Sequence, residues 1–502
     1  MVAAPGSPAT LDPEFDVNIQ TTDAIGMLYD SLIKFAEIED PENPNVRRED
    51  VSITDGQWNV EGKLAESWEI SDGGRKVVYT LKRGIKSNWG NELTANDVKW
   101  SFDRRFALAA LGSFYLGTLQ IGDPDQIRVE GDYAISFQTE KPQPLFIPIM
   151  VNLYLPVFDA TKLKEIHDGG DKWGREFLKN QSAGFGPYEI QELNRGQQTV
   201  FQARDDYYGE APAMKTVVYR EVPNSPQRVA LVQGGDADVA QYLRPRELNQ
   251  LKGVDGVRVD SVQGTQQTWI ELNAKMEPFN DVRVRQAMNY AFPFKDVLDT
   301  VYFGFGRPLG TGIPTIYPYA TEDFFDYETD LERARELLDE AGAGGFSTEL
   351  SYNAGVPEQE EIATLYQTGL REIGVNIQLT KLPAGTFFDF VSKRSKPMIF
   401  YTDAPWCPDP GYSNYLYFHK NSFVNYSNYV NNEVSELIDA GLQTIEESER
   451  EEIYTRVQEI YMEEAPWVFI VRPDPALAVR ENVSGWIYYT SNNVRFQDFR
   501  KT

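Results

Sequence analysis

The chain has 502 residues, of which 41% are hydrophobic, and a net charge of −28. This length suffices for two or three domains with large cores, and the charge argues against nucleic acid as a partner, because neutralising phosphates requires basic patches. The single cysteine, Cys407, excludes a disulfide within the chain, and no apolar run approaches the roughly 18 residues of a membrane helix.

The acidic charge is most simply that of a soluble, repulsive surface. The more specific alternative is that the electrostatic field of this negative charge steers a cationic ligand to the protein. The first residues, MVAAPGSPAT, have neither the basic region nor the apolar core of a signal peptide. The sequence alone is therefore compatible with a cytosolic protein or with a mature form carrying an added Met1.

The first clear elements lie between residues 61 and 105. Residues 76–82 alternate apolar and polar side chains, which predicts a half-buried strand. Thr94 and Asp97 have nearly the spacing of a capping box, and apolar residues recur every four positions after them. We expect a short amphipathic helix there, followed by a hairpin over 127–137 that turns at Gly131–Asp132.

Further along the chain, strands and helices alternate, which predicts an α/β protein. Residues 217–242 and 349–379 each have the pattern strand, helix, strand, and this pattern indicates βαβ units with parallel pairing. A helix is expected over 329–342, with a capping box formed by Thr329 and Glu332, and another over 448–464.

Motifs for chemistry are sparse. The two histidines, His167 and His419, lie far apart in sequence and there is no HExxH, so we expect structural histidines and neither a metal nor a cofactor. A GxSxG nucleophile elbow is absent. GFGRPLG at 304–310 follows a predicted helix, so we interpret it as a loop. Among 76 acidic residues some carboxylate pair always exists, which leaves a glycosidase pair without a specific signal.

The one concentrated candidate site lies in residues 400–429, which are rich in tyrosine, phenylalanine and tryptophan. YTDAPWCPDPGY predicts a proline-stiffened loop after a strand at 398–402. Loops at strand ends are where α/β folds bind ligands, and aromatic rings offer flat faces for stacking. We therefore expect Trp406 and Tyr412 in a cleft, whereas the later tyrosines are expected mainly in the core.

Several ordered motifs resemble one known family. LAESWEIS, YTLKRGIK and LTANDVKWSF, between residues 64 and 102, are similar to the signature region of the family 5 extracellular solute-binding proteins. SAGFGPYEI at 182–190 and TWIELNAKMEPFNDVRVRQAMNYAF at 268–292 resemble later motifs of that family, although Phe185 replaces its usual small residue. The resemblance covers nearly the whole chain and is weaker after Gly344.

The resemblance implies a type II periplasmic-binding-protein fold, with two α/β lobes joined by two strands and an extra subdomain inserted in the first lobe. Trp269–Asn273 and Trp467–Arg472 would be the two joining strands. The expected division is 1–44, 181–268 and 474–502 for the first lobe, 45–180 for the inserted subdomain and 269–473 for the second lobe.

The function implied is that of a receptor for an ABC importer. The receptor would capture a peptide-like or other polar solute in an interlobe cleft by hinge closure and deliver it to a membrane permease. Oligosaccharides, glycosides and opine-like solutes are the alternative ligands, and a two-domain α/β glycosidase is the alternative class. We expect a monomer without enzymatic activity or cofactor, located in the periplasm or outside the cell. On this reading the sequence is a mature form with an added Met1.

The resemblance also offers two alignments of the site loop. In peptide-binding members an aspartate of this loop pairs with the α-amine of the peptide. Aligning on Trp406 makes Asp409 that acid, whereas aligning on Asp409–Pro410 places Trp406 there and removes the amine anchor, which favours uncharged ligands. We prefer the second alignment, because the preceding strand then shifts less. Arg394 lies near a carboxylate-pairing position of the family but is expected to face solvent. The candidate ligand-binding residues are Trp406, Asp409, Asp403, Tyr412, Cys407, Trp269, Tyr29 and Arg394.

Overall fold

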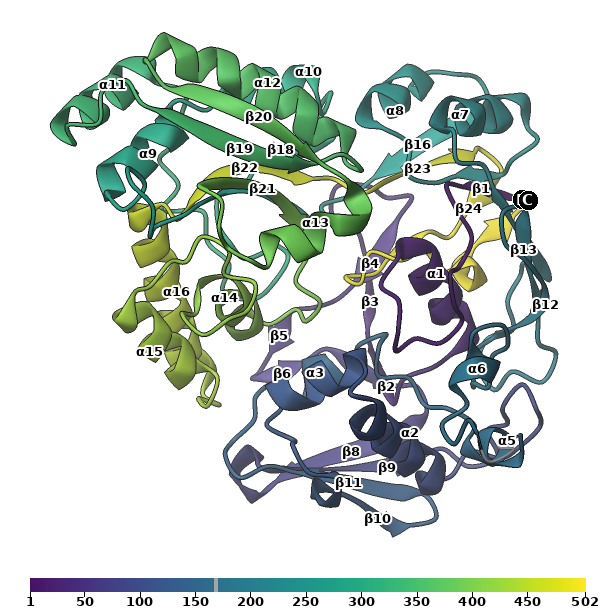
Figure 1. Ribbon diagram of the computed structural model, residues 1–502. Helices are drawn as coiled ribbons and strands as arrows, with labels where there is room; N and C mark the ends of the chain where they lie inside the picture. Colours follow the sequence, from purple (N-terminus) through teal and green to yellow (C-terminus); the bar gives the residue numbers. More distant parts are fainter. Residues whose placement is uncertain (167–169) are drawn as a thin grey trace. The chain divides into compact units, whose positions relative to one another are not determined.

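The computed structural model describes residues 1–166 and 170–502. The chain forms two compact units, and Figure 1 shows their elements. Unit 1 comprises Met1–Val262 and Ala476–Thr502, and unit 2 comprises Gln263–Pro475. The finer division into a lobe and an inserted subdomain stays a prediction, and the expected structural role of His167 falls outside the described residues.

Unit 1 is built on a seven-stranded sheet with the order β12-β13-β14-β1-β15-β23-β16. The strand β1, Val2–Ala4, lies between β14 and β15 and is parallel to both. The βαβ unit predicted over 217–242 is therefore confirmed, with β1 inserted between its two strands. The bounds are β12 Tyr188–Asn194, β13 Gln198–Ala203, β14 Thr216–Glu221, α7 Ser225–Gly234, β15 Val239–Ala240, β16 Val257–Ser261 and β23 Ala476–Arg480.

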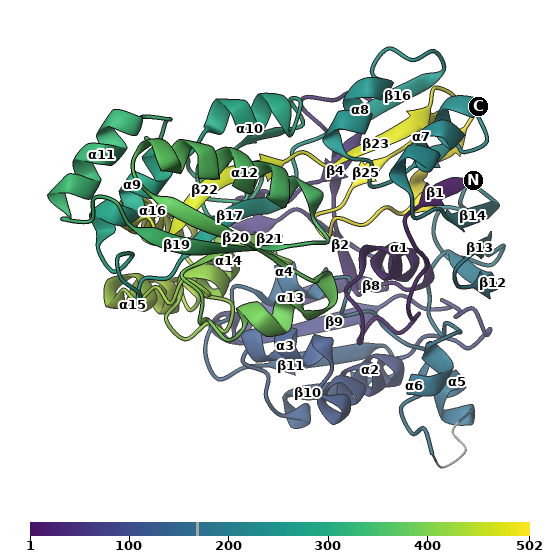
Figure 2. The same ribbon diagram turned by 45° about the horizontal axis from the view of Figure 1, so that its top comes forward.

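A second sheet of unit 1 has four strands in the order β10-β11-β9-β8. Val77 and Tyr79 on β9 are fully buried, as the alternation of residues 76–82 predicts. The helix α2 packs against β10 and β11, and Figure 2 shows the same helix and sheet from a second direction. The predicted strand, hairpin and helix are confirmed, with the bounds β8 Ala65–Ser71, β9 Lys76–Leu81, α2 Ala95–Leu108, β10 Ile127–Gly131 and β11 Ala134–Gln138.

The start of α2 confirms the predicted cap. Thr94 and Asp97 form a capping box in which the Thr94 backbone N–H donates to Asp97 Oδ2 at 2.8 Å. The cap predicted at Thr329 is wrong. Helix α11, Leu331–Glu340, is capped by Asp330, whose Oδ1 accepts from Arg333 N at 2.9 Å. The Thr329 hydroxyl instead donates to the Phe292 carbonyl at 2.6 Å.

Unit 2 is built on a six-stranded sheet with the order β18-β22-β17-β21-β19-β20. The βαβ unit predicted over 349–379 is confirmed, because β19 and β20 are parallel and α12 connects them. Residues 304–310 are not only a loop, since β18 pairs with β22. The bounds are β17 Gln267–Leu272, β18 Gly306–Pro308, β19 Ser347–Asn353, α12 Pro357–Glu372, β20 Asn376–Leu382, β21 Met398–Asp403 and β22 Trp467–Pro473.

The core of unit 2 joins this sheet to its helices. Ile270 and Leu272 of β17, Met288 of α9 and Tyr366 of α12 belong to one buried cluster. The helix predicted over 448–464 is confirmed as α16. The helices are α9 Val282–Tyr290, α10 Phe294–Thr300, α13 Ala384–Val391, α14 Pro410–Phe418, α15 Asn432–Gly441 and α16 Glu447–Glu464.

The remaining elements of unit 1 are shorter. They include α1 Ile19–Leu28, β2 Ile33–Phe35, β3 Glu37–Glu39, β4 Arg47–Glu49, β7 Val60–Gly62, α3 Leu111–Thr118, α8 Pro245–Leu251 and β25 Ile487–Tyr488. Among the helices of the described residues, none combines the length and hydropathy needed to cross a membrane.

Candidate ligand-binding site

Asp403 lies at the end of β21, where the predicted loop begins. Its side chain is half-buried, and its Oδ1 accepts from the Ala404 backbone N–H at 2.8 Å. Burial raises the pKa of Asp403 to about 6, although the Ala404 N–H and the Tyr417 hydroxyl act in the opposite direction. Within residues 1–166 and 170–502, no lysine, arginine or histidine forms an ion pair with this carboxyl. Asp403 is thus a partly desolvated acid that lacks a cationic partner.

A cluster of aromatic rings lies behind Asp403. Trp269 stacks on Trp467 with ring centroids 4.2 Å apart and planes at 17°. Tyr401 and Tyr417 approach Trp269 with centroid distances of 5.4 Å and 5.2 Å. Trp269 is 0% exposed, so its ring is part of this packed cluster and presents no free face for the ligand contact expected of it.

Glu271 connects the two stacked indoles, and sequence reasoning missed it. Trp269 Nε1 donates to Glu271 Oε1 at 2.7 Å, and Trp467 Nε1 donates to Oε2 at 2.9 Å. Glu271 is 1% exposed, and burial raises its pKa to about 8 in spite of these donors. The acid fixes the aromatic cluster across the adjacent strands β17 and β22. The apolar context of TWIEL is the only local signal for a buried acid.

Asp409 has a structural partner that the sequence did not indicate. It is fully buried, and both of its oxygens accept from Arg450 NH2 at 2.8 Å. Oδ1 also accepts from the Gly411 backbone N–H at 2.8 Å, which caps α14. This geometry does not fit the expected role of Asp409 as the partner of a ligand amine, because its charge is already balanced inside unit 2.

The other candidates in the loop differ in exposure. Trp406 is half-buried, whereas Cys407 and Tyr412 are buried, at 0% and 4% exposure. Burial raises the pKa of the Cys407 thiol well above its usual range, so this cysteine is an unreactive core residue. Trp406 is therefore the least buried of these three candidates.

The remaining two candidates are engaged elsewhere. Arg394 is half-buried rather than free in solvent, and its NH2 donates to the Ser422 carbonyl at 2.5 Å. Tyr29 belongs to unit 1 and is 3% exposed. Its hydroxyl donates to the Leu11 carbonyl at 3.0 Å, and its ring meets Phe158 edge-on at 5.5 Å. Both side chains have internal partners that account for their positions.

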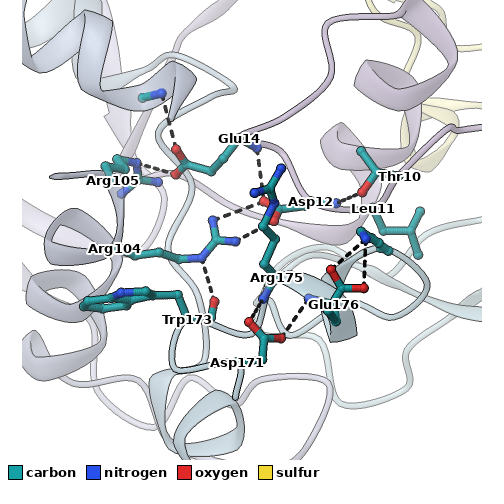
Figure 3. A network of polar contacts seen from close by, with 12 residues as sticks. Thr10, Leu11, Asp12, Glu14, Arg104, Arg105, Asp171, Trp173, Arg175 and Glu176 are labelled. Atoms are coloured by element: carbon teal, nitrogen blue, oxygen red, sulfur yellow. Dashed lines mark hydrogen bonds and ion pairs between the residues drawn. The ribbon is translucent and has the colours of Figure 1, made fainter. Parts of the chain in front are cut away.

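Figure 3 shows a polar network of unit 1 that sequence reasoning also missed. Arg104 donates to both oxygens of Asp12, and Arg105 Nε lies 2.8 Å from Glu14 Oε1. All four side chains are nearly or fully buried. The two pairs tie the N-terminal segment to α2, and within this network each buried charge is matched by an opposite one.

Metal ligands do not gather in the described chain: no group of three or more histidine, cysteine, aspartate or glutamate side chains in its described residues could hold an ion. His419 is buried and stacks on Tyr415 at 4.6 Å, and its Nδ1 accepts from Asn421 N at 3.2 Å. The site therefore offers hydrogen bonding, stacking and one carboxylate without an ionic partner.

Comparison with known proteins identifies the family of the chain. Residues 59–425 match the Bacterial extracellular solute-binding proteins, family 5 Middle. The chain is 26% identical over 492 residues to the probable D,D-dipeptide-binding periplasmic protein DdpA of Escherichia coli K12, covering 97% of this chain and 91% of the relative. It is also 26% identical over 516 residues to the dipeptide-binding protein of the same organism, covering 96% and 90%.

A solved structure confirms the fold class. The periplasmic binding protein DppA of Helicobacter pylori, in complex with the peptide STSA, matches with a TM-score of 0.83 at 23% identity, over 100% of this chain and 97% of that chain. The fold is thus the two-lobed α/β fold of the periplasmic binding proteins, as the motifs predict. The chain belongs to the bacterial extracellular solute-binding proteins of family 5, and its function is to bind a solute for an ABC importer.

Proposed function

We propose that the solute is a peptide-like molecule with a free ammonium group, and that Asp403 is the acid that pairs with this group. The observation that carries the proposal is the half-buried carboxyl of Asp403, which has no cationic partner in the described residues. The curated relatives named for dipeptides support the choice of ligand class.

The electrostatics of the loop favour Asp403 over Asp409. An unpaired carboxylate in a partly buried site is costly, and a bound ammonium removes this cost by forming a charge-assisted hydrogen bond. Asp409 already has this compensation from Arg450. A ligand ammonium would gain little at Asp409 and much at Asp403. The proposal departs from the preferred alignment, in which Trp406 removes the amine anchor.

The titration of Asp403 makes the proposal pH-dependent. Its pKa is raised to about 6 in the free protein, and an ammonium ligand requires the ionised form. Ligand affinity should therefore be constant above this pKa and should fall as the pH drops through it, by about tenfold per unit well below it. A neutral sugar ligand would not lose affinity in this way.

Several finer points are part of the same proposal. The protein acts as a carrier without catalytic turnover, works outside the cytoplasmic membrane as a monomer, and delivers its ligand to permease subunits. Trp406 supplies a stacking face for an apolar part of the ligand. Closure of the two units on the ligand is the mode of capture that the motifs of the family imply.

Calorimetry with the intact protein tests the ligand class. Free-amine dipeptides and tripeptides, the same peptides with an acetylated N-terminus, and a panel of oligosaccharides are titrated at pH 7.5 and pH 5. We expect binding of free-amine peptides, loss of binding on acetylation and weaker binding at pH 5. Equal binding of the acetylated peptides, or binding of oligosaccharides alone, would contradict the proposal.

A further inference from the structure

A cavity of about 310 Å³ is lined by residues of unit 1 alone, so it shares no residue with the loop of unit 2 that carries Asp403. It is lined by residues of β2, β4 and β7, by the segment 207–211 and by the C-terminal segment 485–500. Figure 1 labels β2 and β4 among the strands of unit 1. The volume is at the lower end of the range of small-molecule sites, about 300–1,000 Å³.

The charge of the lining is opposite to that of the chain. Three acidic side chains line the cavity, Glu37, Glu210 and Asp498. Six basic side chains line it, namely Lys34, Arg47, Lys63, Lys82, Arg495 and Arg500. A local excess of positive charge in a protein with a net charge of −28 calls for a physical reason. A concave, low-dielectric wall lined by one sign of charge concentrates ions of the other sign.

Most of these basic groups have partners. Glu37 pairs with Lys34 at 2.9 Å and with Arg47 at 3.0 Å, and Glu210 pairs with Arg500 at 2.7 Å. Lys63 pairs with Asp30, a fully buried acid behind the lining. Lys82 Nζ donates to the Gly62 carbonyl at 2.9 Å. The charge of Arg495 acts on the carboxyl of Asp498 in the same lining, but the two side chains form no ion pair.

The side chain of Arg495 forms neither a hydrogen bond nor an ion pair in the described part of the chain, and its Nε is buried without a partner. Its guanidinium lies 3.7 Å from the centroid of the Tyr489 ring. A Cβ atom added at Gly26 of α1 would lie 3.1 Å from both Cγ and Nε of Arg495, so the stem is packed against that helix. The guanidinium is held in place on the cavity wall with its hydrogen-bonding capacity unused.

The basic side chains of the lining also repel one another. Burial lowers the pKa of Lys63; Asp30 opposes the shift, whereas the charges of Arg495 and Lys34 add to it. Like charges held close together in a partly desolvated site repel one another, and an anion placed among them relieves the repulsion. A planar guanidinium beside an ammonium is the arrangement that binds the oxygens of phosphate or carboxylate.

We propose that this cavity is a binding site for a small oxyanion, a phosphate or carboxylate group, held by Arg495 with Lys63 and Lys34 in support. Arg47 and Arg500, with side chains 52% and 58% exposed, attract the anion towards the cavity. The site lies outside the Asp403 loop, and the proposal holds whatever solute that loop binds.

Isothermal titration calorimetry of the full chain, in a low-salt buffer free of phosphate, tests the proposal with inorganic phosphate and with citrate as separate probes. We expect saturable binding of at least one probe, which also identifies the preferred oxyanion. Arg495→Gln should weaken that binding by about tenfold or more, because it removes a charge-assisted hydrogen bond. Arg83→Gln is the matched control, since Arg83 also lies over a tyrosine ring, at 4.9 Å from Tyr133, but does not line the cavity.

Two further measurements keep the outcome decisive. Circular dichroism establishes that Arg495→Gln is folded, and if it is not, Arg47→Gln at an exposed position should still weaken binding severalfold. Absence of binding of both probes to the unaltered protein would overturn the proposal. Equal binding by the parent, Arg495→Gln and Arg47→Gln would overturn it as well.

Discussion

Replacing Asp409 separates a structural role from a ligand-binding role. Asp409→Asn removes the negative charge that contacts Arg450 through two oxygens at 2.8 Å. The Arg450 side chain is only 4% exposed, so its guanidinium is then buried without an ionic partner. Breaking a buried pair in this way costs about 3–5 kcal/mol. The asparagine oxygen can still accept from Gly411 N, whereas Asp409→Ala loses that cap too, for about 1 kcal/mol more.

Urea unfolding followed by circular dichroism measures this cost as a loss of stability of unit 2. Asp409→Asn/Arg450→Met, which removes both charges, should be more stable than Asp409→Asn alone. Ligand affinity of the folded Asp409→Asn protein should stay within about threefold of the parent, since the acid is fully buried in a pair. A variant that keeps its stability but loses ligand binding would refute the reasoning and place Asp409 in the site.

Three further predictions concern the loop and the aromatic cluster. Trp406→Ala should weaken ligand binding by about 1–3 kcal/mol in calorimetry with little change in melting temperature; unchanged binding would place Trp406 outside the site. Trp269→Phe removes the indole donor to Glu271 and should lower the free energy of unfolding in urea by about 1–3 kcal/mol; a stability equal to that of the parent would show that this bond contributes little. Burial raises the pKa of Glu271 to about 8, above its value in the unfolded chain. Ionisation of Glu271 therefore lowers the free energy of unfolding, and the parent should become more stable as the pH falls from about 8 towards 5. Glu271→Gln should flatten that part of the melting-temperature profile, and an unaltered profile would assign the pH dependence to other groups.

Elements with a contiguous periodic pattern could be predicted from the sequence. The strand at 76–82, the hairpin at 127–137 and the βαβ unit at 349–379 each carry their signal within neighbouring residues. The strand β1 was missed because Val2–Ala4 is only three residues long and its partners begin at Thr216. A segment this short has no periodicity to read, so only the long-range pairing defines it.

The cap of α11 and the strand β18 show a second limit. Thr329 and Asp330 are both good capping residues, and the contact between Thr329 and the distant Phe292 carbonyl leaves Asp330 to cap the helix. Residues 304–310 are glycine-rich and the sequence predicts a loop there, but pairing with β22 makes Gly306–Pro308 a strand. In both places tertiary contacts decide between local options of similar free energy.

The elements around the candidate loop could be predicted in part, but the partners of its acids could not. The strand, the proline-rich loop and its aromatic residues are visible in the sequence, and the structure places them together in unit 2. The partner of Asp409 is Arg450, 41 residues away, and Glu271 meets Trp467 across 196 residues. Contacts over such separations leave no local signal in the sequence. Only the fold shows that Asp409 has a cationic partner and that Asp403 has none in the described residues.

The central claim is that Asp403 holds the ammonium of the ligand, and calorimetry of Asp403→Asn at pH 7.5 with a free-amine peptide tests it most directly. The account predicts a loss of several kcal/mol in binding, because an unpaired buried ammonium is very costly, with stability retained. Asp439→Asn, which changes an acid of unit 2 whose side chain is 58% exposed, is the control and should bind like the parent. Binding of the free-amine peptide by Asp403→Asn as tight as that of the parent would contradict the claim.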